Sequence, residues 1–157
     1  MASRQRSDNT ETRYLQPGWF TRQVVNRIMR RLARLGWSPK GLRQLAVRGR
    51  SSGEWQTVPV NLLELDGKRY LVAPRGQTQW VRNIRVAGGG ELRVGRLVEA
   101  IEVTELDDAD KPRLLREYLV RWKAEVKMFF VGIDERSSDE ELLRIAPGFP
   151  VFEVRAA

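Results

Sequence analysis

A turn flanked by glycines, Gly49–Gly53, holds residues that are suited to binding an anion. Glycines allow backbone N–H groups to point toward a bound anion, while Arg50 adds a charged donor and Ser51 and Ser52 add hydroxyls. A Gly/Ser turn between two strands is more often only a turn. The segment by itself therefore leaves two interpretations open, an anion site and a plain connection.

A second segment with similar chemistry follows Pro74. Arg82 and Arg85 are three residues apart, which puts them on one side of a helix whose amino-terminal end attracts negative charge. Trp80, near the start of this helix, could lie against a flat ring, although a tryptophan here is more often part of a core. From Gly67 to Arg96 the chain has seven basic residues and one acid, so this region also favours anions.

The sequence contains neither histidine nor cysteine. Histidine is the usual general acid–base, metal ligand and haem ligand, and cysteine supplies thiolate nucleophiles, disulfides and metal-binding sulfur. Hydrolytic triads and metal centres therefore have almost no residues to use, and no metal site is expected. Chemistry carried by a bound organic cofactor remains, because the protein then supplies only binding, orientation and electrostatics.

Positive charge is concentrated near the amino terminus. The formal net charge is +8, and between Glu11 and Glu54 there are ten basic residues and no acidic one. Residues 1–14 are predicted to form a disordered leader, and residues 15–38 an amphipathic helix with five arginines around its apolar stripe. This helix either covers the core or binds an anionic membrane surface, and both alternatives stay open.

Targeting signals are not evident in the sequence. The polar start of the chain lacks the apolar run of a secretory signal, and no stretch approaches the roughly 20 apolar residues that span a bilayer. We therefore expect a cytoplasmic protein, with weak peripheral attachment to the inner face of the cell membrane if the basic helix binds lipid.

Residues 39–157 are predicted to form one domain rich in hairpins. Apolar patterning and turn signals predict strands over Leu45–Val47, Trp55–Leu65, Tyr70–Ala73, two arms within Glu91–Leu106, and Val151–Val154. Helices are expected over Gln79–Ala87, from Asp110 and Pro112 onward, and after a capping box formed by Ser138 and Glu141. No long helix links successive strands, so the expected fold is an antiparallel β-barrel with flanking helices, in the α+β class.

Pro59 falls within the longest of these strands. Proline donates no backbone hydrogen bond, so it is a poor residue for the middle of a sheet. We expect this point to be a sheet edge, a bulge or a place where the sheet opens for a ligand.

The order of these features resembles that of a known family. The chain resembles the deazaflavin-dependent nitroreductases, which use coenzyme F420. The segment that carries the resemblance is GRSSGEWQTVPVNLLELDGKRYLVAPRGQTQWVRNIR, followed by GGGELRVGR. The resemblance runs from about Leu45 to Leu106 and continues more loosely to Pro150–Phe152. It implies the split-barrel fold of flavin mononucleotide-binding oxidases and a hydride transfer from the reduced deazaflavin to an organic acceptor such as a quinone, an enone or a nitro compound.

The resemblance also implies a cofactor site. The glycine-flanked turn would meet the phosphate and lactyl-glutamate tail, and the ring would lie beside Trp80 and Pro59. The implied cofactor-binding residues are Arg50, Ser51, Ser52, Pro59, Arg75, Trp80, Arg82, Asn83 and Arg85. Many relatives have a basic residue in place of Ser51, so phosphate affinity here must rely on the arginines.

The sequence leaves more than one candidate for the proton donor and more than one for the function. Asn61, Tyr118 and water are the candidate proton sources; Asn61 stands where relatives that reduce nitroimidazoles have a tyrosine, which puts that activity in doubt. One rival function is an enzyme that uses flavin mononucleotide. Another is a non-catalytic split barrel that binds a lipid-like or other anionic ligand. A nucleic acid is not expected, because the tryptophans are scattered instead of forming a stacking surface with the arginines.

Overall fold

A computed structural model describes residues 41–157. The predicted leader (1–14) and the predicted basic helix (15–38) lie outside the described residues. The strands are β1 (Leu42–Arg48), β2 (Trp55–Leu65), β3 (Lys68–Val72), β4 (Gly89–Val94), β5 (Leu97–Glu105) and β6 (Val151–Ala156). The helices are α2 (Gln79–Ala87), α3 (Pro112–Val126) and α4 (Asp139–Ile145), with short 3-10 turns η2 (Asp108–Asp110), η3 (Lys127–Phe129) and η4 (Ala146–Gly148).

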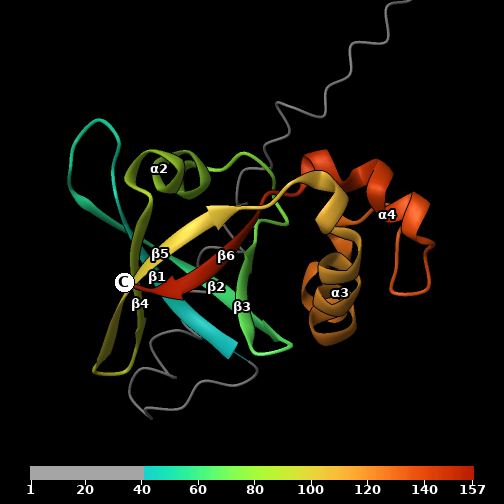
Figure 1. The fold of residues 1–157 in the computed structure, drawn as a ribbon, viewed down its shortest axis with the longest axis horizontal. Helices are drawn as coiled ribbons and strands as arrows, with labels where there is room; N and C mark the ends of the chain where they lie inside the picture. Colours follow the sequence, from blue (N-terminus) through green and yellow to red (C-terminus); the bar gives the residue numbers. More distant parts are fainter. Residues whose placement is uncertain (1–40) are drawn as a thin grey trace, which may run out of the picture.

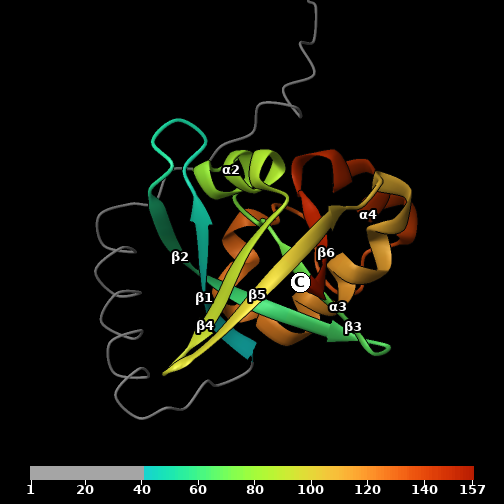
Figure 2. The same ribbon diagram turned by 60° about the vertical axis from the view of Figure 1, so that its left-hand side comes forward.

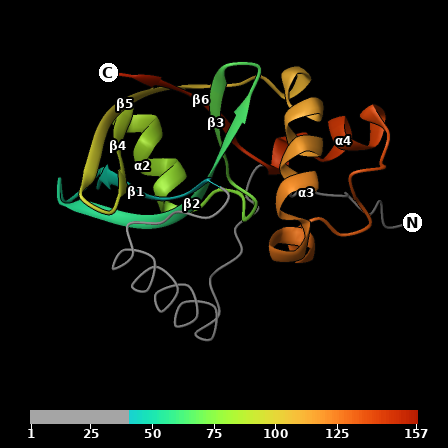
Figure 3. The ribbon, with the colours of Figure 1, turned by 90° about the horizontal axis from the view of Figure 1, so that it is seen from below.

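The six strands close into a barrel in which every neighbouring pair is antiparallel. Their order around the barrel is β1-β2-β3-β6-β5-β4, and β4 returns to pair with β1. Helix α2 lies over one end of the barrel, while α3 and α4 pack together beside it (Figures 1 and 3). The expected α+β barrel with flanking helices is confirmed.

Local signals account for the hairpins. Asp66 and Gly67 both have positive φ, 52° and 73°, which is the backbone of the tight turn that matches the twist of paired strands. Close approach requires glycine at the start of β4: a Cβ on Gly90 would lie 2.3 Å from the carbonyl oxygen of Ala46 on β1. Glycine at this position therefore allows the β1–β4 pairing that closes the barrel.

Two hydrophobic cores lie on opposite faces of β2. Leu62 points into the barrel and belongs to the core that α2 covers with Val81 and Ile84. Leu63 belongs to the second core, between the barrel and α3. Because both faces of this strand are buried there, it needs few charged residues.

The strand β2 also has an unpaired edge. Among residues 41–157, Trp55–Asn61 pairs with β1 on one side only, since β3 pairs with Leu62–Leu65 alone. Pro59 lies in this half of the strand, so the expected sheet edge is confirmed (Figure 2 shows the β1–β2 hairpin projecting beside α2).

The structure changes one detail of the expected helices. Asp110 belongs to the 3-10 turn η2, and Lys111 occupies the position before α3 without a side-chain cap. The capping box of Ser138 and Glu141 at α4 is confirmed. Among the helices of residues 41–157, none combines the length and the hydropathy that crossing a bilayer requires.

Candidate functional site

The turn between β1 and β2 is held by its own hydrogen bonds. Gly53 N–H donates to the Gly49 carbonyl at 2.9 Å, and Gly49 N–H donates to the Glu54 carbonyl at 2.8 Å. The Ser52 hydroxyl accepts from Glu54 N–H at 3.2 Å. A Cβ on Gly49 would lie 2.6 Å from that hydroxyl and 2.9 Å from Gln56 Nε2, so a larger residue here would displace both side chains. The turn is therefore formed before any ligand arrives.

Two backbone donors of this turn remain available. Arg50 N–H donates to Asn83 Oδ1 at 3.1 Å. The N–H groups of Ser51 and Ser52, both exposed residues, have no acceptor within residues 41–157. Successive free N–H groups in a turn form a concave site for an anion.

The guanidinium of Arg50 is held by neutral partners. Its Nη1 donates to Gln79 Oε1 and to Asn83 Oδ1, each at 2.8 Å. Within the described part of the chain it forms no ion pair, so its positive charge is not compensated by a carboxylate. Asn83 is only 2% exposed and its Nδ2 donates to Gln56 Oε1 at 3.2 Å. Asn83 thus lies behind the turn and anchors it, instead of lining a groove.

The amino-terminal end of α2 adjoins this turn, because Gln79 is the first residue of the helix. Thr78 precedes it with no side-chain cap, and its buried Oγ1 has no hydrogen-bond partner in residues 41–157. The first helical turn contains no acidic residue. Free N–H groups and the helix dipole make such an end attractive to an anion.

The remaining arginines of the region differ in what surrounds them. Arg82 is exposed and forms no ion pair within residues 41–157. Arg85 is paired with Glu105 at 2.6 Å and lies in a hollow of about 390 Å³ that Asp107 and Asp108 also line. Arg75 is half-buried, with its guanidinium 6.0 Å from the centre of the Phe129 ring.

Trp80 is packed mainly against the barrel. The centre of its ring is 5.8 Å from that of Phe152, and the side chain is half-buried against the core inside the barrel that α2 covers. Pro59 is also half-buried, at the unpaired edge of β2.

Asn61 is in the second half of β2 and Tyr118 is in α3, both away from the turn. Tyr118 is 2% exposed, within the second core, and its ring is 5.1 Å from that of Trp122. Burial raises the pKa of its hydroxyl, which is hydrogen-bonded to the Asn61 side chain. Asn61 Nδ2 also donates to Glu125 Oε2 at 3.4 Å. The structure does not bring these two candidates together with the turn.

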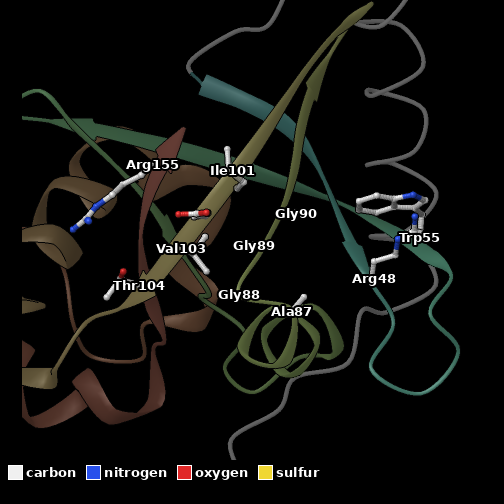
Figure 4. A pocket seen from close by; sticks show the side chains of 11 residues that line it. Arg48, Trp55, Ala87, Gly88, Gly89, Gly90, Ile101, Val103, Thr104 and Arg155 are labelled. Carbon is white, nitrogen blue, oxygen red and sulfur yellow. The ribbon is translucent and has the colours of Figure 1, made fainter. Parts of the chain in front are cut away.

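A groove of about 580 Å³ lies beside the carboxy-terminal end of α2 (Figure 4). The run Gly88–Gly90 borders it, with Trp55 and Arg48 on one side and Arg155 on the other. Arg48 stacks on the Trp55 ring at 4.2 Å. None of the predicted cofactor-binding residues lines this groove.

Sequence reasoning missed four residues near the turn. Gln56 accepts a hydrogen bond from Asn83, and Gln79 accepts one from Arg50. Arg48 stacks on Trp55. A signal existed only for the last pair, since closing the hairpin turn brings Arg48 directly opposite Trp55. The two glutamines carry no such signal because their partners are 27 and 29 residues away along the chain.

Comparison with protein families gives one match. A model of F420H(2)-dependent quinone reductases matches residues 19–132. No curated protein matches the chain.

Solved structures resemble the chain in fold. A domain-swapped dimer is 19% identical, covers 87% of this chain and 97% of its own, and has a TM-score of 0.51. A protein of unknown function from Agrobacterium tumefaciens is 14% identical, covers 92% of this chain and 58% of its own, and has a TM-score of 0.55. A structure described as an F420-H2 dependent reductase is 19% identical, covers 74% of this chain and 95% of its own, and has a TM-score of 0.49. The fold is the split β-barrel with flanking helices that the resemblance implied.

Proposed function

Because the chain belongs to the family of F420H2-dependent quinone reductases, and is thus an F420-dependent oxidoreductase with coenzyme F420 as its cofactor, we propose that it reduces a quinone-type acceptor. The observation that carries our assignment of the cofactor site is the charge of Arg50, which has no carboxylate partner among residues 41–157 and is held beside the N–H groups of Ser51 and Ser52, free within the same residues. Family membership also favours an enzyme over the non-catalytic binder that the sequence left open.

The residues at the turn fit the anionic tail of the cofactor. Phosphate oxygens accept several hydrogen bonds and favour charged donors. The turn offers Arg50 and two N–H groups, and the adjacent helix end offers a positive dipole. Arg82, three residues along α2 from Gln79, adds a charge on the same side. We leave Arg85 out of the site because Glu105 neutralises it.

Reduction of a quinone to its hydroquinone takes one hydride, which the bound reduced deazaflavin supplies, and one proton. The hydroxyl of Tyr118 is buried in the second core, so we assign the proton to water. Pro59 and Trp80 are proposed to lie beside the ring, at the unpaired edge of β2. Arg75 is proposed to border the acceptor side together with Phe129. The chain itself then binds, orients and shields the reactants.

Titration with coenzyme F420 and with flavin mononucleotide, followed by tryptophan fluorescence, tests this assignment. We expect F420 to bind at least about tenfold more tightly, a difference of about 1.4 kcal/mol, since its longer anionic tail reaches more donors. Arg50→Ala should weaken F420 binding by roughly one to two decades, because a charge-assisted hydrogen bond contributes about 1.5–3 kcal/mol.

The control is Arg121→Ala, which removes an exposed arginine of α3 and should bind F420 as the wild type does. Equal affinity for the two cofactors would favour the flavin mononucleotide alternative. Wild-type affinity in Arg50→Ala would show that the turn is only a connection.

We further propose a cytoplasmic protein whose segment 15–38 attaches it weakly to anionic membranes. Its five arginines and apolar stripe support this proposal, and a quinone acceptor would be dissolved in such a membrane.

A further inference from the structure

We propose that Asn83 is a positioning residue, which holds Arg50 ready for the anionic tail of the cofactor while leaving the charge of Arg50 uncompensated. The inference rests on the proposed role of Arg50 in cofactor binding. Asn83 would support the site from behind, and its side chain would be an amide because an amide is uncharged.

Geometry supports the positioning role. Asn83 Oδ1 accepts from the main chain of Arg50 at 3.1 Å and from its guanidinium at 2.8 Å. The other end of the side chain donates to Gln56 Oε1 at 3.2 Å, which fixes the orientation of the amide. With 2% exposure, Asn83 has little freedom to move. One buried side chain therefore ties both the backbone and the side chain of Arg50 to helix α2.

Charge explains why an amide stands here. Arg69 and Arg116 are held by carboxylates, those of Glu99 and Asp139, each at 2.7 Å. An ion pair with a carboxylate orients an arginine but cancels most of its electrostatic field. A hydrogen bond to an amide oxygen orients the arginine and leaves its positive charge uncompensated. Both side-chain acceptors of Arg50, Asn83 and Gln79, are amides. Arg50 is thus oriented and remains a full positive charge.

The exposed position of Gln79 allows the charge argument to be tested without disturbing the core. Gln79→Glu places a carboxylate beside Arg50, and Gln79→Met removes the same hydrogen bond without adding charge. Asn83→Asp makes the corresponding change from the buried side. Each variant is titrated with F420 over a range of salt concentrations, and with the same deazaflavin lacking its phosphate and lactyl-glutamate tail.

We expect Gln79→Glu and Asn83→Asp to weaken F420 binding by about tenfold, close to the effect of losing a charged donor. Their dissociation constants should depend less on salt than that of the wild type, because one charge no longer contributes. Gln79→Met should bind within about threefold of the wild type and keep its salt dependence, since a neutral hydrogen bond is a weaker contribution. The tail-less deazaflavin should bind all variants equally, and the KM for F420H2 should rise while kcat is unchanged.

Equal F420 affinities and salt dependences in Gln79→Glu and Gln79→Met would overturn the inference. The inference would also be overturned if adding Gln79→Glu to Arg50→Ala weakened F420 binding by the same factor as in the wild type. The new carboxylate would then act on the tail directly and not through Arg50. Should Asn83→Asp fail to fold, the Gln79 pair still decides whether the charge of Arg50 must stay uncompensated. Gln56→Leu then tests the positioning role, because it removes the exposed partner that orients the amide of Asn83 and should weaken F420 binding without adding charge. If Arg50→Ala itself leaves F420 binding unchanged, the proposed cofactor site fails, and that result is separate from the failure of Asn83 as its positioning residue.

Discussion

Arg50 and Arg85 show how the same residue type serves different purposes within one short region. Both lie where the sequence favours anions, and both contact α2 or belong to it. Arg85 is neutralised by Glu105, which suits a structural ion pair. Arg50 is oriented by amides only, which suits a donor to a ligand. The difference lies in the partner and not in the arginine.

Tyr118 provides a test of the proton source at the scale of one residue. Its raised pKa and burial keep the hydroxyl protonated and away from solvent. We expect Tyr118→Phe to lower the free energy of unfolding by about 0.5–1.5 kcal/mol, through loss of the hydrogen bond to Asn61, with kcat and KM unchanged. Denaturant unfolding and steady-state kinetics measure the two effects.

Tyr70→Phe on β3 is the matched control, since it removes the hydroxyl of a half-buried tyrosine that packs against the second core. A large fall in kcat for Tyr118→Phe, with unfolding unaffected, would return Tyr118 to the candidate proton donors.

At the scale of elements, α2 combines packing and binding. Val81 and Ile84 cover one end of the barrel, and both are fully buried. Asn83 lies next to them and reaches the turn. The amino-terminal end of the helix adjoins the same turn. Because the core fixes the helix, it also fixes where Arg50 is presented.

The basic segment 15–38 carries a prediction at the same scale. Each arginine near an anionic surface contributes about 1 kcal/mol, so we expect the full chain to sediment with anionic vesicles at low salt and to be released as salt is raised. Replacing Arg30, Arg31 and Arg34 by glutamine should abolish this binding. The matched control replaces three exposed arginines elsewhere, Arg121, Arg136 and Arg144, and should still sediment. A full-length protein that stays in the supernatant at low salt contradicts the membrane proposal.

For the whole molecule, the closed barrel carries an ion pair between β3 and β5, which flank β6. Arg69 contacts both oxygens of Glu99, at 2.7 and 2.8 Å. This hydrogen bonding lowers the pKa of Glu99 from its ordinary value of 4.5. A carboxylate with a lowered pKa in the folded state stabilises the protein above its unfolded pKa, and this stabilisation is lost as pH falls through the folded value.

Glu99→Gln should therefore be less stable than the wild type at neutral pH, and the difference should shrink as pH falls below the ordinary carboxyl pKa and vanish below the lowered pKa of the folded state. We expect at most about 1 kcal/mol, because Glu99 is partly exposed and solvent screens the pair. Denaturant unfolding from neutral to acid pH measures the difference, with Glu102→Gln as the control, because Glu102 is an exposed carboxylate of the same strand that forms no ion pair within residues 41–157. A difference that is independent of pH would mean that the pair contributes through packing alone.

The sequence by itself determined the elements of this protein and, through the order of its motifs, the family and the cofactor. The capping box of Ser138 and Glu141 and the bounds of α2 were both predicted. Each depends on interactions between residues a few positions apart, so a short stretch of chain carries the whole signal.

Only the tertiary structure decided which of the predicted site residues have a free charge and which are buried. Arg50 meets its partners 29 and 33 residues away, and Arg85 meets Glu105 at a separation of 20. Tyr118 is buried because α3 packs on the barrel, a contact that no local pattern specifies. The charge, exposure and pKa of a side chain depend on whichever groups the fold brings beside it, and barrel closure brings together residues that are distant in sequence.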